Sequence, residues 1–176
     1  MTTATTPPPA LSPPDERART AYDVDFYAWT TDQAALLRTG RLSEADLENI
    51  AEEIESLGRV ERRGLASHVR TVIEHLMKLQ ASPATEPRVG WRETVLRVRD
   101  DIEDVLDDSP SLRRELASII ARETERARRL VRRALEERGE PVDVLSSLTY
   151  DEGQMLGPWM PDERLPRLGP PSSRGA

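Results

Sequence analysis

Apolar residues recur every three or four positions through most of the chain, which is the spacing of one face of an α-helix. No stretch alternates strictly between apolar and polar residues, so the pattern predicts no β-strand and no βαβ unit. It predicts four main helices, each with one apolar face. Their ranges are 25–39, 43–80, 91–107 and 109–138.

Capping and stop signals delimit these helices. Gly40 supplies a left-handed stop after the first helix. Ser43, with Asp46 three residues later, is typical of a capping box at the start of the second. Ser109 and Pro110 predict the start of the fourth, because proline is tolerated at the first helical position.

We expect the apolar face of each helix to be buried. Gly58 and Gly64 interrupt the second helix, and each costs up to ~1 kcal/mol relative to alanine. We interpret 43–80 as one long helix, bent near these glycines, with two separate helices as the alternative. The expected faces are Phe26, Trp29, Gln33, Leu36 and Leu37; Leu47, Ile50, Ile54, Leu57, Leu65, Val69, Val72, Ile73, Leu76 and Leu79; Trp91, Val95, Val98, Ile102 and Val105; and Leu112, Leu116, Ile119, Ala127, Leu130 and Ala134.

Helices that are apolar on one face must bury those faces against each other, which predicts an all-α helical bundle of four main helices. The segment 142–162 is short and irregular, and we expect it to pack on one end of the bundle. The second helix would extend about 57 Å if straight, against about 25 Å for the third. A bend near the glycines resolves this mismatch, and so does a second chain that covers the overhang, which would make the protein a homodimer.

Proline placement separates a central domain from two tails. Five of the 14 prolines lie between positions 7 and 14, and five lie between 158 and 171. Proline collects where helices are absent. We therefore expect disordered tails at 1–17 and 164–176 and one helical domain at 22–162.

Composition narrows the function classes. The 176 residues include no cysteine, which excludes disulfides, thiol nucleophiles and thiolate metal sites. No apolar run reaches the ~18 residues of a membrane span, and the first residues lack a secretory signal pattern. We expect a cytoplasmic protein with no membrane contact. The net charge of −7 argues against general binding to phosphate backbones.

The two histidines do not indicate a metal centre. Carboxylate di-metal bundles place a Glu-x-x-His pair on each of two helices, whereas here Leu65 precedes His68 and Val72 precedes His75 by three residues. We predict no metal and no cofactor. Among the carboxylates of the second helix, Glu53 flanks the apolar face, where we expect either a partner inside the bundle or a salt bridge at its rim.

His75 and Lys78 lie one turn apart beside the apolar face of the second helix. The simplest interpretation of His75 is a structural residue at the margin of the core. Lys78 is the only lysine among 25 basic residues, and its compact ammonium group is not equivalent to a guanidinium. No known motif assigns a catalytic residue. The alternative function is a metal-dependent or hydrolytic enzyme that uses Glu53, His75 and Lys78.

The fourth helix is rich in arginine, which raises nucleic-acid binding as a weaker alternative. Glutamates on the same helix offset much of its charge, and it has no aromatic residue for base stacking, so this alternative is not favoured. Glu123 lies on the apolar face of this helix, where a charge needs a partner. We predict that Arg99, on the third helix, is that partner.

Four of the seven aromatic residues lie within eight positions at the start of the first helix. Phe26 and Trp29 share one helical face, and we predict that they are aromatic anchors joining the first helix to the second. Trp91 begins the apolar face of the third helix and is predicted to be a further anchor.

Five short motifs occur in a set order along the chain: DFYAW at 25–29, EEIESLG at 52–58, HLMK at 75–78, Trp91, and SPSL at 109–112. In this order and spacing they resemble a bacterial family known as domain of unknown function, family 29. The resemblance covers about 22–162. It implies an all-helical fold, and it implies no activity.

These patterns favour a small helical-bundle protein that acts through protein–protein interaction, with itself or with another protein, and without chemistry of its own. The sequence has no Gly-rich phosphate loop, no Gly-x-Ser-x-Gly motif and no zinc-protease motif.

Overall fold

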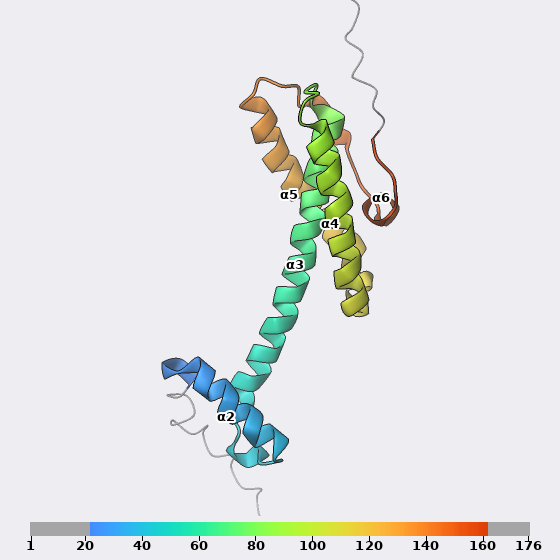
Figure 1. The fold of residues 1–176 in the computed structure, drawn as a ribbon. Coiled ribbons are helices and arrows are strands. Elements are labelled where there is room, and N and C mark those ends of the chain that lie inside the picture. Colours follow the sequence, from blue (N-terminus) through green and yellow to red (C-terminus); the bar gives the residue numbers. More distant parts are fainter. Residues whose placement is uncertain (1–21, 162–176) are drawn as a thin grey trace, which may run out of the picture. The chain divides into compact units, whose positions relative to one another are not determined.

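The computed structural model describes residues 22–161, and all regular structure within this range is helical (Figure 1). The predicted all-α helical bundle is confirmed. The tails predicted at 1–17 and 164–176 lie outside the described residues. No helix in the described range is long and apolar enough to cross a membrane.

The chain divides into two compact units. The N-terminal unit ends at Arg59, and the C-terminal unit begins at Val60. The described part of the N-terminal unit contains α2 (Phe26–Arg38), the 3₁₀ helix η1 (Leu42–Glu44) and the first part of α3 (Leu47–Ala81). The rest of α3 belongs to the C-terminal unit.

The ends of α2 follow the local signals. The carboxylate of Asp25 accepts a hydrogen bond from the backbone N–H of Ala28 at 2.9 Å, which caps the first turn. Gly40 has a φ of +72°, a left-handed conformation that glycine adopts without strain. The prediction of a helix at 25–39 is therefore confirmed to within one residue at each end.

The start of α3 corrects the prediction at Ser43. Ser43 lies in η1, and α3 begins four residues later, at Leu47. Asp46 is the capping residue, because its carboxylate accepts from the backbone N–H of Asn49 at 3.3 Å. The N–H of Asp46 in turn donates to the side-chain oxygen of Gln33 at 2.8 Å, a tertiary contact between α2 and the start of α3.

Through Gly58 and Gly64, α3 is one continuous helix. The interpretation of a single long helix is confirmed, and the alternative of two separate helices is wrong. A glycine lowers helix stability but keeps its backbone donor and acceptor, so the hydrogen-bond ladder continues through both positions.

The core of the molecule lies in the C-terminal unit. It is formed by the later part of α3 together with α4 (Arg88–Asp108), η2 (Pro110–Glu115), α5 (Leu116–Glu136), η3 (Asp143–Ser147) and α6 (Glu152–Leu156). In Figure 1, α4 runs alongside the later part of α3. Core residues with no more than 3% of their surface exposed include Leu65, Val69, Val72, Ile73, Leu76, Met77, Val95, Val98, Ile102, Leu106, Leu116, Ile119, Ile120, Ala127, Val131, Leu135, Leu145 and Met155.

Several details of this unit differ from the predictions, and one is that α4 begins at Arg88 rather than at position 91. Pro110 starts a 3₁₀ helix rather than an α-helix, and α5 begins only at Leu116. Late in α5 the buried residues are Val131 and Leu135, whereas Leu130 is 52% exposed. The physical reason is register: from the buried Ala127, steps of four residues stay on the face toward the core, and Leu130 lies beside that face.

Candidate functional site

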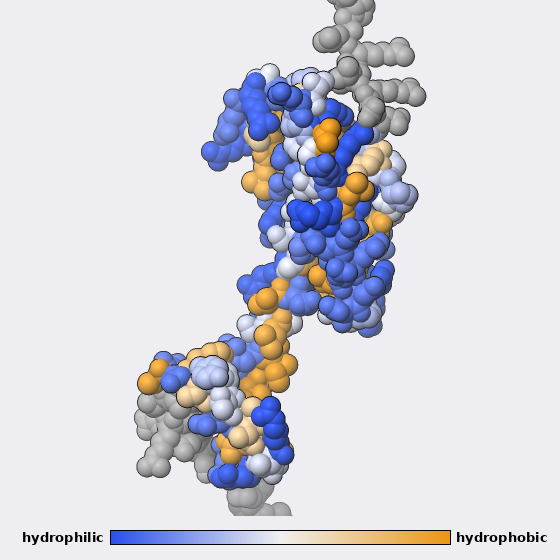
Figure 2. Space-filling model, in the orientation of Figure 1, coloured by the Kyte–Doolittle hydropathy of each residue, from blue (hydrophilic) through white to orange (hydrophobic). Residues whose placement is uncertain are grey.

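A row of large aliphatic side chains is exposed on the first part of α3. Leu47, Ile54 and Leu57 are 52%, 63% and 70% exposed, and Ile50 is half-buried. The prediction that this stripe is buried is therefore wrong, because in the described structure no element covers these side chains. Figure 2 shows hydrophobic surface along this part of α3.

Two small residues lie on the same helix face. Ala51 and Gly58 follow Leu47 and Ile54 by four positions each, and both are exposed. Apart from its chain neighbours and its own helix backbone, a Cβ atom added at Gly58 would meet nothing within 4 Å, so packing within the chain does not require a glycine there. We call Leu47, Ala51, Ile54, Leu57 and Gly58 the α3 face.

Carboxylates border the α3 face on both sides. Glu48, Glu52 and Glu55 lie along one side, and Glu53 lies on the other, beside Leu57. Glu55 forms an exposed ion pair with Arg59 at 3.4 Å. Residues 22–59 contain nine aspartates and glutamates against three arginines, a net charge of −6 out of −7 for the whole chain.

Glu53 has a defined partner within the N-terminal unit. Its carboxylate accepts a hydrogen bond from the hydroxyl of Tyr22 at 2.5 Å. This hydrogen bond raises the pKa of Tyr22 from near 10 to about 12, because the carboxylate stabilises the protonated hydroxyl. The sequence singled out Glu53, but no sequence signal identified Tyr22 as its partner.

Trp29 is buried, with 3% of its surface exposed, and it is the one buried apolar residue among the described residues 22–59. Phe26 stacks on it at a centroid distance of 5.7 Å, and the ring of Tyr22 meets it edge-on at 4.9 Å. Phe26 itself remains 49% exposed and Leu37 41% exposed, so the prediction that these two residues are buried is wrong. Trp91 lies half-buried near the start of α4.

His75 and Lys78 lie in the C-terminal unit, whereas Glu53 belongs to the N-terminal unit. All three lie on α3. The Nδ1–H of His75 donates to the carbonyl of Thr71 at 2.8 Å, and both His75 and Lys78 are half-buried. Burial lowers the pKa of His75, and the nearby ammonium of Lys78 lowers it further. Within residues 22–161, no three His, Asp or Glu side chains gather as a metal site would require.

Arg99 is a buried cation that fastens the C-terminal segment. Its guanidinium donates to the backbone carbonyls of Gln154, Met155 and Trp159 at 2.7, 3.1 and 2.7 Å. Burial lowers the pKa of Arg99. Its Nη1 atom has no hydrogen-bond partner within the described part of the chain.

Glu123 is fully buried, and its neighbours are arginines other than the predicted one. It accepts from Arg122 and Arg126 of α5 at 3.0 Å each, and Arg70 of α3 lies 3.6 Å from its second oxygen. The predicted Glu123–Arg99 contact is wrong, because Arg99 turns its donors to the carbonyls near α6. The spacing of Arg126, three residues after Glu123, was the available sequence signal.

Several other arginines of α5 also have partners within the chain. Arg128 pairs with Glu125 and donates to the carbonyls of Leu145 and Leu148 at 2.9 and 2.8 Å. Arg133 pairs with Glu137 at 2.9 Å. Several of the arginines of α5 therefore stabilise the fold itself, and their presence does not require a bound ligand.

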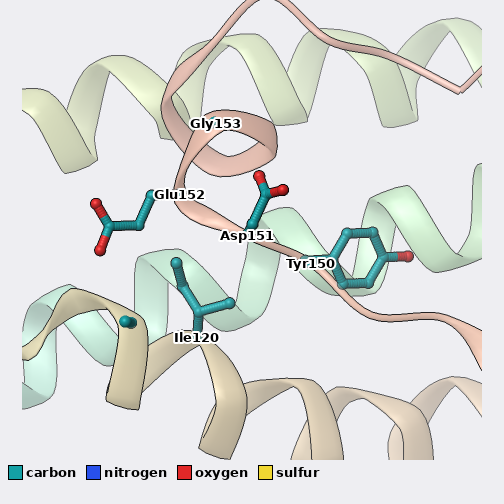
Figure 3. Close-up of a pocket in the computed structure, with 6 residues that line it drawn as sticks. Ile120, Tyr150, Asp151, Glu152 and Gly153 are labelled. Carbon is teal, nitrogen blue, oxygen red and sulfur yellow. The ribbon is translucent and has the colours of Figure 1, made fainter.

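An open pocket of about 510 Å³ lies between α5 and the α6 segment (Figure 3). Two of its polar side chains are already engaged: the carboxylate of Asp151 caps α6, and the hydroxyl of Tyr150 donates to Gln80 at 2.7 Å. Figure 3 shows the side chains of Tyr150 and Glu152 pointing in opposite directions. The pocket does not gather reactive groups around one point.

Comparison with known proteins identifies the family of the chain. No curated protein and no solved structure matches the chain. A family model described as "Domain of unknown function DUF29" matches residues 21–156. This range contains α2, α3, α4, α5 and α6, and so includes parts of both units. The chain therefore belongs to the DUF29 family.

Proposed function

We propose that this protein is a protein–protein interaction module that acts through the α3 face, without catalytic chemistry of its own. The observation that carries the proposal is the exposure of Leu47, Ile54 and Leu57 on one side of one helix. Contiguous exposed apolar surface on a globular protein is typical of an interaction site. The occupant is either a second copy of the chain or another protein.

The energetics support this interpretation. Transfer of a Leu or Ile side chain from water to an apolar environment yields about 1.5–3 kcal/mol, so covering these three side chains stabilises a complex by several kcal/mol. Among the described residues 22–59, Trp29 is the one apolar residue that the structure buries.

Photo-crosslinking in cells of the source organism tests the proposal. A benzophenone amino acid replaces Ile54, and in a matched control it replaces Leu130, an exposed leucine of α5. We expect irradiation to produce a discrete adduct from position 54 and none from position 130. Mass spectrometry of the adduct then shows whether the crosslinked chain is the same protein or another one.

Absence of any adduct from position 54, with the protein folded and expressed, would overturn the proposal. Equal adducts from both positions would also count against it, because they would indicate contact with any exposed leucine. A cytoplasmic location remains part of the proposal, and fractionation of the same cells tests it.

No observation favours the enzyme alternative over this proposal, since Glu53 is hydrogen-bonded to Tyr22 in one unit while His75 and Lys78 lie in the other. Nucleic-acid binding by α5 has no supporting observation either, because Arg122, Arg126 and Arg128 are paired with glutamates.

A further inference from the structure

We propose that the partner of the α3 face is a basic amphipathic α-helix of another protein, whose apolar row packs on the face while its lysines and arginines meet the bordering carboxylates. This inference rests on the proposed function, and it names the chemistry of the partner.

The alternation of large and small side chains on the α3 face favours a helical partner. Large side chains at Leu47 and Ile54 alternate with small residues at Ala51 and Gly58 over three turns. Such alternation leaves notches into which side chains of a second helix insert, as in knobs-into-holes packing. A helix also satisfies its own backbone hydrogen bonds, so it can cover an apolar face that offers none.

Gly58 is the most specific element of this argument. A glycine inside an exposed helix lowers stability, and apart from its chain neighbours and its own helix backbone no atom lies within 4 Å of where the Cβ of Gly58 would be. Packing within the chain therefore does not explain the glycine. Close approach of a partner helix does, because the missing side chain lets that helix lie nearer to α3.

The negative charge around the α3 face favours a partner whose apolar row is bordered by basic side chains. Glu48, Glu52 and Glu55 lie along one side of the face, and residues 22–59 carry a net charge of −6. A partner with lysine or arginine beside its apolar row is attracted and oriented by this field, and an acidic partner is repelled.

The same charge argues against the other occupants. A second copy of the chain would bring an identical acidic border to the interface. The segment 1–21 has only Met1 and Leu11 as large aliphatic residues, and the segment 162–176 has Pro166 between its two leucines, so neither can supply an apolar row on a helix.

The direct test uses a labelled helical peptide of about 18 residues with leucines at i, i+3, i+4 and i+7 and lysines beside them. Two control peptides accompany it: one with glutamate in place of lysine, and one with the same composition but a scrambled order. Fluorescence anisotropy with the full chain measures each affinity. We expect the cationic amphipathic peptide to bind about tenfold or more tightly than either control, and more weakly at high salt.

Variants of the chain locate the site. The double variant Ile54→Asp/Leu57→Asp should weaken binding of the cationic amphipathic peptide about tenfold or more, and the control Leu130→Asp should leave it unchanged. Gly58→Leu separates binding from folding. It should raise the melting temperature, because leucine favours helix over glycine and a Cβ atom at this position has open space beyond its own helix backbone, yet it should weaken binding by filling the notch.

The outcomes separate this inference from the proposed function. Equal binding of the scrambled cationic peptide would overturn the inference, because charge alone would then suffice. Self-association of the chain through the α3 face in sedimentation equilibrium, or preference for the glutamate peptide, would overturn the basic partner and leave the proposed function standing. If the peptide does not bind but position 54 forms crosslinks, the basic partner is overturned and the proposed function stands. If the peptide does not bind and position 54 forms no crosslinks, the basic partner and the proposed function are both overturned.

Discussion

At the scale of single residues, the buried charges Arg99 and Glu123 are held by partners both near to and far from them in sequence. Arg99 reaches three carbonyls more than 50 positions later, and Glu123 receives Arg70 from α3 as well as two arginines of its own helix. An unpaired buried charge is costly, so each of these contacts is required for the packing of the C-terminal unit.

Glu123→Gln tests the buried cluster. The substitution keeps the size of the side chain but removes the negative charge between Arg70, Arg122 and Arg126. We expect the free energy of unfolding to fall by about 2 kcal/mol in urea titrations, at the lower end of values for broken buried pairs because the arginines are partly exposed. Glu137→Gln, which breaks the exposed pair with Arg133, should change it by less than about 0.5 kcal/mol.

His75 makes stability dependent on pH. Burial lowers its pKa below 6.5 in the folded chain, so the unfolded chain binds the proton more readily. The stability contributed by the neutral ring is present above pH 6.5 and is lost as the pH falls from 6.5 through the folded pKa. The free energy of unfolding should therefore drop less between pH 7.5 and 5 in His75→Gln than in the wild type. Equal drops in the two proteins would contradict this assignment.

At the scale of elements, α3 changes role along its length. Its later part supplies buried residues to the core, whereas its first part exposes the α3 face. The apolar period is similar in both parts, so the local pattern does not distinguish them. Only the later part has α4 and α5 packed against it in one core.

Replacing Gly40 or Gly64 by alanine should change the stability of the protein in opposite directions, because the two glycines have different backbone conformations. At Gly64, inside α3, a Cβ would meet nothing within 4 Å beyond its chain neighbours and its own helix backbone, so Gly64→Ala should stabilise the protein by about 0.5–1 kcal/mol. At Gly40 the φ of +72° strains any other residue, so Gly40→Ala should destabilise it by about 1 kcal/mol. Urea denaturation midpoints of the two variants measure both effects, and a shift in the same direction would refute the explanation.

At the scale of the whole molecule, the two units differ in how much they bury. The C-terminal unit has a continuous core from α3, α4, α5 and α6, and the described part of the N-terminal unit buries Trp29 together with Gln33 and Asp46. Local opening free energies follow the amount of buried apolar contact. The units should therefore open independently of each other.

Hydrogen exchange measures this difference. Amides of α2 should exchange more than about tenfold faster than those at the centre of α5, because a difference of 1.4 kcal/mol in opening free energy is already a factor of ten. Addition of the cationic amphipathic peptide should slow exchange in α2 and early α3 only. Uniform protection across both units in the free protein would show that they unfold as one.

Much of this protein was determined by the sequence alone. The helical class, the single long helix and the Gly40 stop follow from local rules, since periodicity and capping act within a few residues. The tertiary structure decided which apolar faces are covered and which arginines meet Glu123. Burial depends on surface supplied by distant segments, and a long guanidinium pairs with whatever segment passes within reach. For that reason the same pattern that is core at Leu65 and Val69 is open surface at Leu47 and Ile54.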